Sequence, residues 1–206
     1  MMTKNDIINE LINNPEYDSE WIGSVAEIVS KNFEKEDYTD TNAYTDISTY
    51  KNYNAGQMEV IKQGLFAPEN PYDLISEIHH RNNSAVAFEF NATQLQLLGI
   101  LIGYIKSNPD KDSDRFNILF NYEIPYAKLN FVIKGIVEGY DDMIDYIDFD
   151  PDQICEIYAG HKDEVNYASY ASKDIPDTVM GAIRYCLNNN ITFTINDNKT
   201  ITISAM

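Results

Sequence analysis

Hydrophobic and polar positions along the chain repeat one arrangement, which marks the beginning of a helix. It is clearest from Tyr53 to Met58, where Asn54 and Gln57 lie three residues apart. This spacing suits a capping box, in which each side chain accepts a hydrogen bond from the other residue's main-chain N–H. Tyr53 and Met58 flank the box as a hydrophobic staple, and Ile61 lies one turn further on the same face. The pattern predicts a helix that starts after Asn54 and buries one side.

The same arrangement recurs along the chain. We number the copies 1 to 6 by their leading apolar residues: Tyr17, Tyr53, Phe90, Ile124, Phe149 and Ile175. Copies 3 and 5 match copy 2 closely, copies 4 and 6 have a proline at the cap position, and copy 1 has Trp21 in place of the glutamine. Successive copies are 36, 37, 34, 25 and 26 residues apart. Because short amphipathic helices bury their apolar faces only against neighbours, the sequence predicts an array of short helical repeats.

Other segments alternate with the period of a β-strand. Residues 86–90 and 116–122 each place aromatic and aliphatic side chains at every second position, so they are expected to form two strands that can pair. Residues 191–195 and 200–203 flank the turn-rich segment 196–199, which predicts a β-hairpin. An isolated hairpin is only marginally stable, so this one should pack on a helix or pair with another strand. The expected fold is mainly α, with short helical repeats and a small β component; the alternative is α+β.

One continuous body with three parts is expected: an N-terminal helical segment (1–50), a helical repeat region (51–190) and the C-terminal hairpin packed on the same body (191–206). Polar segments at 34–42 and 107–113 are the expected linkers. No apolar run reaches the roughly 20 residues that a membrane-spanning helix needs, and the N-terminus lacks the pattern of a signal peptide. We therefore expect a cytoplasmic protein without membrane contact, in which Cys155 and Cys186 are reduced thiols.

The acidic composition narrows the class of partner. The chain has 33 Asp and Glu against 15 Lys and Arg, which gives a net charge of −18. Repulsion at long range disfavours direct binding to nucleic acid or to an anionic membrane, and favours a basic protein.

Eight carboxylates lie between Lys134 and Lys162 with no Lys or Arg among them: Glu138, Asp141, Asp142, Asp145, Asp148, Asp150, Asp152 and Glu156. On an α-helix, Asp141 and Asp145 share a face about 6 Å apart along the axis, so this stretch can present charges in series like a phosphate backbone. It is the candidate partner-binding site. The alternative is a solvated acidic face that keeps the protein soluble.

A calcium site can be tested against the sequence directly. Asp148, Asp150 and Asp152 have the spacing that opens an EF-hand loop, but Gln153 occupies the position that requires glycine, and Ala159 the position that requires a bidentate glutamate. The sequence therefore does not support an EF-hand.

Other metal and catalytic motifs are missing from the sequence. The histidines have no metal-ligand spacing with the cysteines, and His79-His80-Arg81 instead closes a predicted helix, where cations complement the helix dipole. Neither a Ser-His-Asp order nor a glycine-rich phosphate loop nor a zinc-protease helix occurs. We expect no metal, no cofactor and no enzymatic activity.

A resemblance to a known kind of repeat is carried by these residues: Gln57, Met58, Ile61, Lys62, Gly64 and Leu65. Looser forms, including residues 170–190, extend over much of the chain that follows. The pattern resembles a short helical repeat that occurs in tandem in uncharacterised phage, plasmid and conjugative-element proteins of low-GC Gram-positive bacteria. The resemblance implies a mobile-element origin and a bacterial host cell.

The resemblance and the charge together suggest a function. The leading hypothesis is an inhibitor that binds a host defence nuclease, such as a Cas or restriction nuclease, through an acidic face that mimics nucleic acid. Such a protein would be of the anti-CRISPR or antirestriction type. The alternative is a non-catalytic protein-interaction scaffold of a phage or conjugative element, in which the charge serves only solubility.

Overall fold

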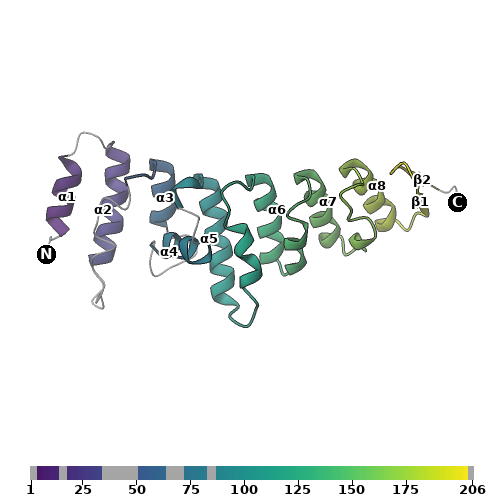
Figure 1. The fold of residues 1–206 in the computed structure, drawn as a ribbon, viewed down its shortest axis with the longest axis horizontal. Coiled ribbons are helices and arrows are strands. Elements are labelled where there is room, and N and C mark those ends of the chain that lie inside the picture. Colours follow the sequence, from purple (N-terminus) through teal and green to yellow (C-terminus); the bar gives the residue numbers. More distant parts are fainter. Residues whose placement is uncertain (1–3, 14–17, 34–50, 64–71, 83–86, 204–206) are drawn as a thin grey trace. The chain divides into compact units, whose positions relative to one another are not determined.

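The computed structural model describes residues 4–13, 18–33, 51–63, 72–82 and 87–203 (Figure 1). The chain divides into two compact units, Met1–Glu123 and Ile124–Met206. The first unit contains α1 (Lys4–Ile12), α2 (Ser19–Phe33), α3 (Ala55–Gln63), α4 (Tyr72–Arg81), the 3₁₀ helix η2 (Ala87–Glu89), α5 (Ala92–Ser107) and the 3₁₀ helix η3 (Asp114–Leu119). The second contains α6 (Tyr126–Val137), η4 (Asp141–Tyr146), α7 (Pro151–Lys162), η5 (Tyr167–Ser169), α8 (Asp177–Asn188), β1 (Phe193–Ile195) and β2 (Ile201–Ile203).

The predicted fold class, mainly α with a small β component, is confirmed. The expected division into 1–50, 51–190 and 191–206 stays a prediction. Several predicted features lie outside the described residues: the linker at 34–42, the leading residue of copy 1, and the Gly64-Leu65 pair of copy 2. In the part of the chain that the structure describes, no helix is both long and apolar enough to cross a membrane.

Capping chemistry starts the helices where the repeat pattern places them. In copy 3, Asn91 Oδ1 accepts from the Gln94 N–H at 2.9 Å, and Gln94 Oε1 accepts from the Asn91 N–H at 2.9 Å. Asn54 and Gln57 make the same reciprocal pair in copy 2, at 2.9 and 2.7 Å. A cap of this kind contributes about 1 kcal/mol. Helices α6 and α8 begin directly after a proline, as the sequence predicts.

Each helix of copies 2 to 6 buries the two positions that lie four and seven residues after its cap. These side chains are fully inaccessible to solvent: Met58 and Ile61, Leu95 and Leu98, Leu129 and Val132, Ile154 and Ile157, Met180 and Ile183. Their spacing puts them on one helical stripe, so burying them packs each helix against its neighbours. The apolar periodicity therefore identified the core positions correctly.

The prediction of strands within 86–90 and 116–122 is wrong, because residues 87–89 and 114–119 form 3₁₀ helices and no other described residue of these segments is in a strand. Phe88 and Phe90 would share one face of a strand, yet Phe90 is fully buried and Phe88 is 36% exposed. In the second segment Phe116 and Leu119 are buried, while Ile118 is 51% exposed. Burial at positions three apart is the spacing of a 3₁₀ turn, and it overrides the alternation in the sequence.

The C-terminal hairpin is confirmed. Strands β1 and β2 pair antiparallel, with Phe193 opposite Ile203 and Ile195 opposite Ile201. The Asn196 N–H donates to the Thr200 oxygen at 2.8 Å and closes the turn. Strand β2 contacts α8, so the hairpin packs on the last helix of its unit, as expected.

Candidate functional site

A buried glutamine fastens copy 2 to the beginning of copy 3. Gln57 Nε2 donates to the main-chain oxygens of Phe88 and Phe90, at 2.9 and 2.6 Å, while its side-chain oxygen completes the cap of its own helix. The Gln57 side chain therefore satisfies main-chain groups on two copies at once. We call the donor contact to the next copy the clamp.

The clamp recurs in four further copies, always from the third residue after the cap. The donors and acceptor oxygens are Trp21 Nε1 to Tyr53 (2.9 Å), Gln94 Nε2 to Tyr122 (3.0 Å), Lys128 Nζ to Ile147 (3.3 Å), and Gln153 Nε2 to Lys173 and Ile175 (3.1 and 2.8 Å). Each acceptor is the leading residue of the next copy or the residue two before it. Every one of these clamps lies within one unit. The repeat is thus defined by a contact as well as by a sequence pattern.

Copy 6 has no donor at this position. Val179 takes the place of the glutamine, and the chain continues into the β-hairpin instead of a further copy. A hydrogen-bond donor therefore occupies this position in the five copies that are followed by another copy, and an apolar residue occupies it in copy 6, which is followed by the hairpin.

Glycine ten residues after the cap lets the following connector pack directly on the helix. A Cβ at Gly135 would lie 2.5 Å from Met143 Cγ on η4, and one at Gly160 would lie 2.8 Å from Tyr167 Cβ on η5 and overlap the Tyr170 hydroxyl. These two copies are followed by the short spacings of 25 and 26 residues, whereas copy 3 has a leucine at this position and a longer connector. Copy 2 also has glycine at this position, Gly64, but is followed by a spacing of 37 residues, so the glycine permits the close approach without setting the period.

An acidic side chain just after α6 receives donors from α7. Glu138 accepts from the Tyr158 hydroxyl at 2.9 Å and from Lys162 Nζ at 3.2 Å. Burial acts to raise the pKa of Glu138, but the hydrogen bonds from Tyr158 and Lys162 outweigh it, so the pKa is lowered. Glu138 is therefore engaged within the protein.

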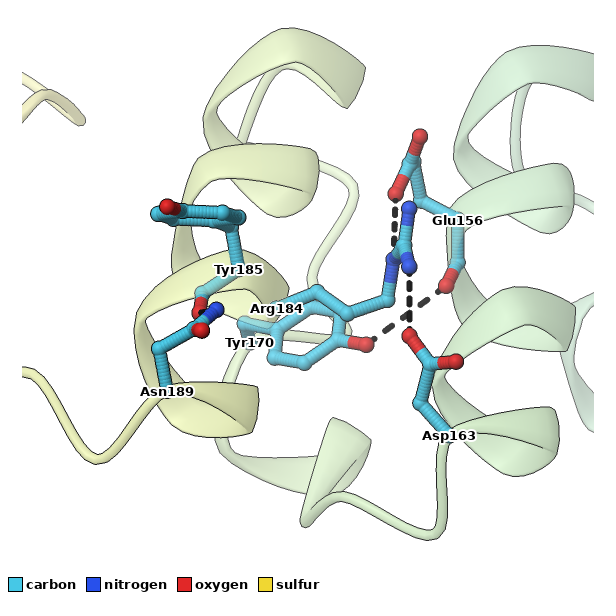
Figure 2. Close-up of polar contacts among 6 residues, drawn as sticks. All are labelled: Glu156, Asp163, Tyr170, Arg184, Tyr185 and Asn189. Carbon is cyan, nitrogen blue, oxygen red and sulfur yellow. Dashed lines mark hydrogen bonds and ion pairs between the residues drawn. The ribbon is translucent and has the colours of Figure 1, made fainter.

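The equivalent position after α7 is Asp163, and it receives a donor from α8. Arg184 lies between two carboxylates, with Nε 2.9 Å from Glu156 Oε2 and Nη1 2.5 Å from Asp163 Oδ2 (Figure 2). Burial acts to lower the pKa of Arg184, but the hydrogen bonds to these carboxylates outweigh it and raise the pKa. On the same helix, Tyr185 points away from this ion pair and is 62% exposed.

Several of the eight predicted site residues have structural roles. Besides Glu138 and Glu156, Asp142 accepts a short hydrogen bond from the Tyr167 hydroxyl, and Asp150 caps α7. The expectation that Asp141 and Asp145 share one α-helical face is wrong, because both lie in the 3₁₀ helix η4. With about three residues per turn, positions four apart point about 120° away from each other. The eight carboxylates therefore do not form a single series of charges on one α-helical face.

Five members of the stretch are exposed to solvent: Glu138, Asp145, Asp148, Asp150 and Asp152. The Asp148 side chain is 80% exposed and lies 3.6 Å from Lys173 Nζ, an exposed pair that contributes little to stability. Whether these residues bind a partner stays a prediction.

A buried histidine lies at the junction of α7 with η4 and η5. The His161 side chain is 8% exposed, and its ring stacks on Tyr140 at 4.5 Å and packs on Tyr167 at 3.9 Å. Its Nε2 lies 3.4 Å from Asp142 Oδ1 and has no hydrogen-bond partner in the described part of the chain. Burial lowers the pKa of His161, although the Asp142 carboxylate acts to raise it, so the imidazole is neutral near pH 7. Burial and Asp142 also raise the pKa of Tyr167.

Among residues 4–13, 18–33, 51–63, 72–82 and 87–203, no group of three or more His, Cys, Asp or Glu side chains converges to hold a metal ion. Cys155 and Cys186 are free thiols, and burial raises the pKa of Cys155. His79 and His80 are exposed in the last turn of α4, the position predicted for them.

Sequence reasoning missed Tyr158, Arg184 and His161. A signal was present for the first two, because both lie eight residues after their caps and face an acid thirteen residues after the preceding cap. His161 gave no such signal. Comparison of the chain with protein-family models, with curated proteins and with solved structures finds no match.

Proposed function

We propose that this protein is a non-catalytic binding protein whose partner is a basic protein surface. The observation that carries the proposal is the recurring clamp, because it holds copies 2 and 3 of the first unit, and copies 4 to 6 of the second, in fixed register, as proteins that bind through repeat surfaces require. The net charge of −18 selects basic partners.

Within the acidic stretch, we assign partner binding to Asp145, Asp148 and Asp152. All three side chains are exposed to solvent. Glu138 and Glu156 accept hydrogen bonds from Tyr158 and Arg184, and Asp150 is the N-cap of α7, so these three acids already have structural roles. Charges at an interface steer association and give it a strong dependence on salt.

The proposed partner is a nuclease of host defence, such as a Cas or restriction nuclease, which would make the protein an anti-CRISPR or antirestriction inhibitor in the bacterial cytoplasm. This finer proposal depends on the likeness of the repeat to those of mobile-element proteins and on the acidity, which suits a channel that binds nucleic acid. It would act by stoichiometric occupation and requires neither metal nor cofactor.

The experiment compares two matched charge variants. One carries Asp145→Asn, Asp148→Asn and Asp152→Asn; the control carries Asp110→Asn, Asp112→Asn and Asp114→Asn, which are exposed aspartates of the other unit. Each protein is immobilised and used to capture partners from a bacterial lysate at about 50 mM and about 500 mM NaCl. Captured nucleases are then assayed for inhibition of DNA cleavage.

We expect basic proteins to be retained at low salt only, and retention to fall at least about tenfold in the first variant but not in the control. Equal retention by both variants would show that these three carboxylates do not bind the partner. Retention that is insensitive to salt, but lost when Tyr126, Val137 and Tyr185 become serine, would support the interaction scaffold instead, because these are exposed apolar side chains of the second unit.

A further inference from the structure

The C-terminal hairpin has an open strand edge. In the part of the chain that the structure describes, the sheet consists of β1 and β2 alone. In an antiparallel pair of strands, hydrogen-bonded and non-hydrogen-bonded residue pairs alternate along the strands. The Asn196 N–H bonds to Thr200, so the next hydrogen-bonded pair is Thr194 with Thr202. The main-chain groups of Phe193 and Ile195 therefore face away from β2. Strand β2 contacts α8. Among the described residues, no main-chain hydrogen bond joins Phe193 or Ile195 to another segment, so the edge of β1 is available.

This edge lacks the usual protection against pairing with another strand. Natural proteins protect edge strands with charged side chains, proline or bulges. Residues 191–195 and 200–203 consist of Ile, Thr and Phe, and the only charges nearby, Asp197 and Lys199, lie in the turn. Ile203 is 55% exposed, so the packing on α8 leaves part of the apolar face uncovered. A two-stranded sheet gains stability from further strands.

The charge distribution indicates what pairs with this edge. Residues 185–206 contain one Asp and one Lys and are neutral, although the whole chain carries −18. Two copies of an acidic protein repel each other over most of their surfaces, and the neutral hairpin is where they can approach at the lowest electrostatic cost. A basic partner would be drawn to the acidic surfaces instead.

We propose that β1 pairs antiparallel with β1 of a second copy of this chain, so that two hairpins form one four-stranded sheet. Such a contact is isologous, because each strand presents the same groups to the other around a two-fold axis. Thr194 is the middle residue of β1, so the two-fold axis places it opposite Thr194 of the second copy. The proposal does not depend on the proposed function.

The test measures mass by sedimentation equilibrium between about 5 and about 200 µM, at about 0.15 M and about 0.5 M NaCl. The wild-type mass should rise from the 23.6 kDa of one chain toward twice that value, and more readily at high salt, because salt screens the repulsion between copies. Added salt should strengthen the association between two copies and weaken the association with a basic partner, so the direction of the salt effect distinguishes them.

Two substitutions and one matched control locate the contact. Thr194→Glu places like charges across the new strand pair and should raise the dissociation constant at least about tenfold. Ile195→Pro removes an outward N–H without a partner inside the hairpin and should do the same. Thr202→Glu makes the identical change on β2, one strand further from the contact, and should leave the dissociation constant within about twofold. Circular dichroism and thermal unfolding verify that each variant is folded.

A wild-type protein that stays at 23.6 kDa up to the highest concentration would overturn the proposal. So would a dimer that persists in both β1 variants, since another surface would then join the copies. A strand of another protein captured by a monomeric chain would equally exclude self-pairing.

Discussion

Gln153 Nε2 lies 2.8 Å from the main-chain oxygen of Ile175, which is 22 residues further along the chain, and Gln153 Oε1 accepts from the Asp150 N–H at 3.1 Å. An amide can fill both roles because it has a donor and an acceptor. A glutamate at this position would suit the helix dipole and the cap, but when ionised it has no N–H for the next copy. The chemistry of the clamp therefore explains why glutamine is used where the capping box alone would accept glutamate.

The first prediction concerns the clamp of copy 3. Gln94→Leu should lower the free energy of unfolding by about 2 kcal/mol, because it leaves the Tyr122 oxygen without its side-chain donor and removes half of the capping box. Gln96→Leu, on an exposed position of the same helix, is the control and should change it by less than about 0.5 kcal/mol. Urea unfolding followed by circular dichroism measures both. Equal effects would mean that the clamp contributes nothing specific.

The second prediction concerns the close approach at Gly160. Gly160→Ala should lower the free energy of unfolding by about 1–3 kcal/mol, since the new methyl group meets Tyr167 and the Tyr170 hydroxyl. Gly23→Ala lies in the exposed interior of α2, where a Cβ would meet nothing within 4 Å, and should raise it by about 0.5–1 kcal/mol. The thermal unfolding midpoint should therefore fall in Gly160→Ala and rise in Gly23→Ala. A midpoint that rises in both variants would contradict the packing described for η5.

The third prediction concerns the ion pair between α7 and α8. Arg184→Met leaves Glu156 and Asp163 beside each other without their shared donor and should lower the free energy of unfolding by about 1 kcal/mol, a modest value because all three side chains are roughly a quarter exposed. Arg184→Lys keeps the charge but not the two-pronged geometry, so it should recover only part of the loss. Repeating the measurement at high salt should shrink the difference from wild type, whereas a difference unchanged by salt would assign the effect to packing.

The fourth prediction concerns pH. Burial lowers the pKa of His161 below its ordinary 6.5, so the unfolded chain binds a proton more readily than the folded protein. The contribution of neutral His161 to the free energy of unfolding is therefore complete above pH 6.5, and it is lost as the pH falls through the pKa of His161 in the folded protein. His161→Phe keeps an aromatic ring between Tyr140 and Tyr167 but cannot titrate.

Urea unfolding at about pH 7.5 and about pH 5 measures this difference. Wild type should lose stability relative to His161→Phe at the lower pH. If wild type instead gained stability there, the attraction of Asp142 for the imidazolium would outweigh burial. A direct titration of the His161 ring by NMR gives the folded pKa independently.

The sequence by itself determined the helix starts, the buried stripe and the hairpin, because these depend on neighbouring residues. A cap and its glutamine are three residues apart, and the positions of Leu95 and Leu98 follow from the helical period alone. The proline at the start of α8 and the turn at 196–199 are local signals of the same kind. Such features are decided within a few residues of the chain.

Only the tertiary structure decided where the glutamine amides point, which carboxylates are engaged, and that 114–119 forms a 3₁₀ helix where a strand was predicted. Gln153 donates to an oxygen 22 residues away, and Arg184 pairs with Glu156 of the acidic stretch and with Asp163, which follows it. Each of these outcomes depends on which groups lie nearby after folding, and the free energy of satisfying a buried carbonyl or a carboxylate outweighs the local preferences of the sequence.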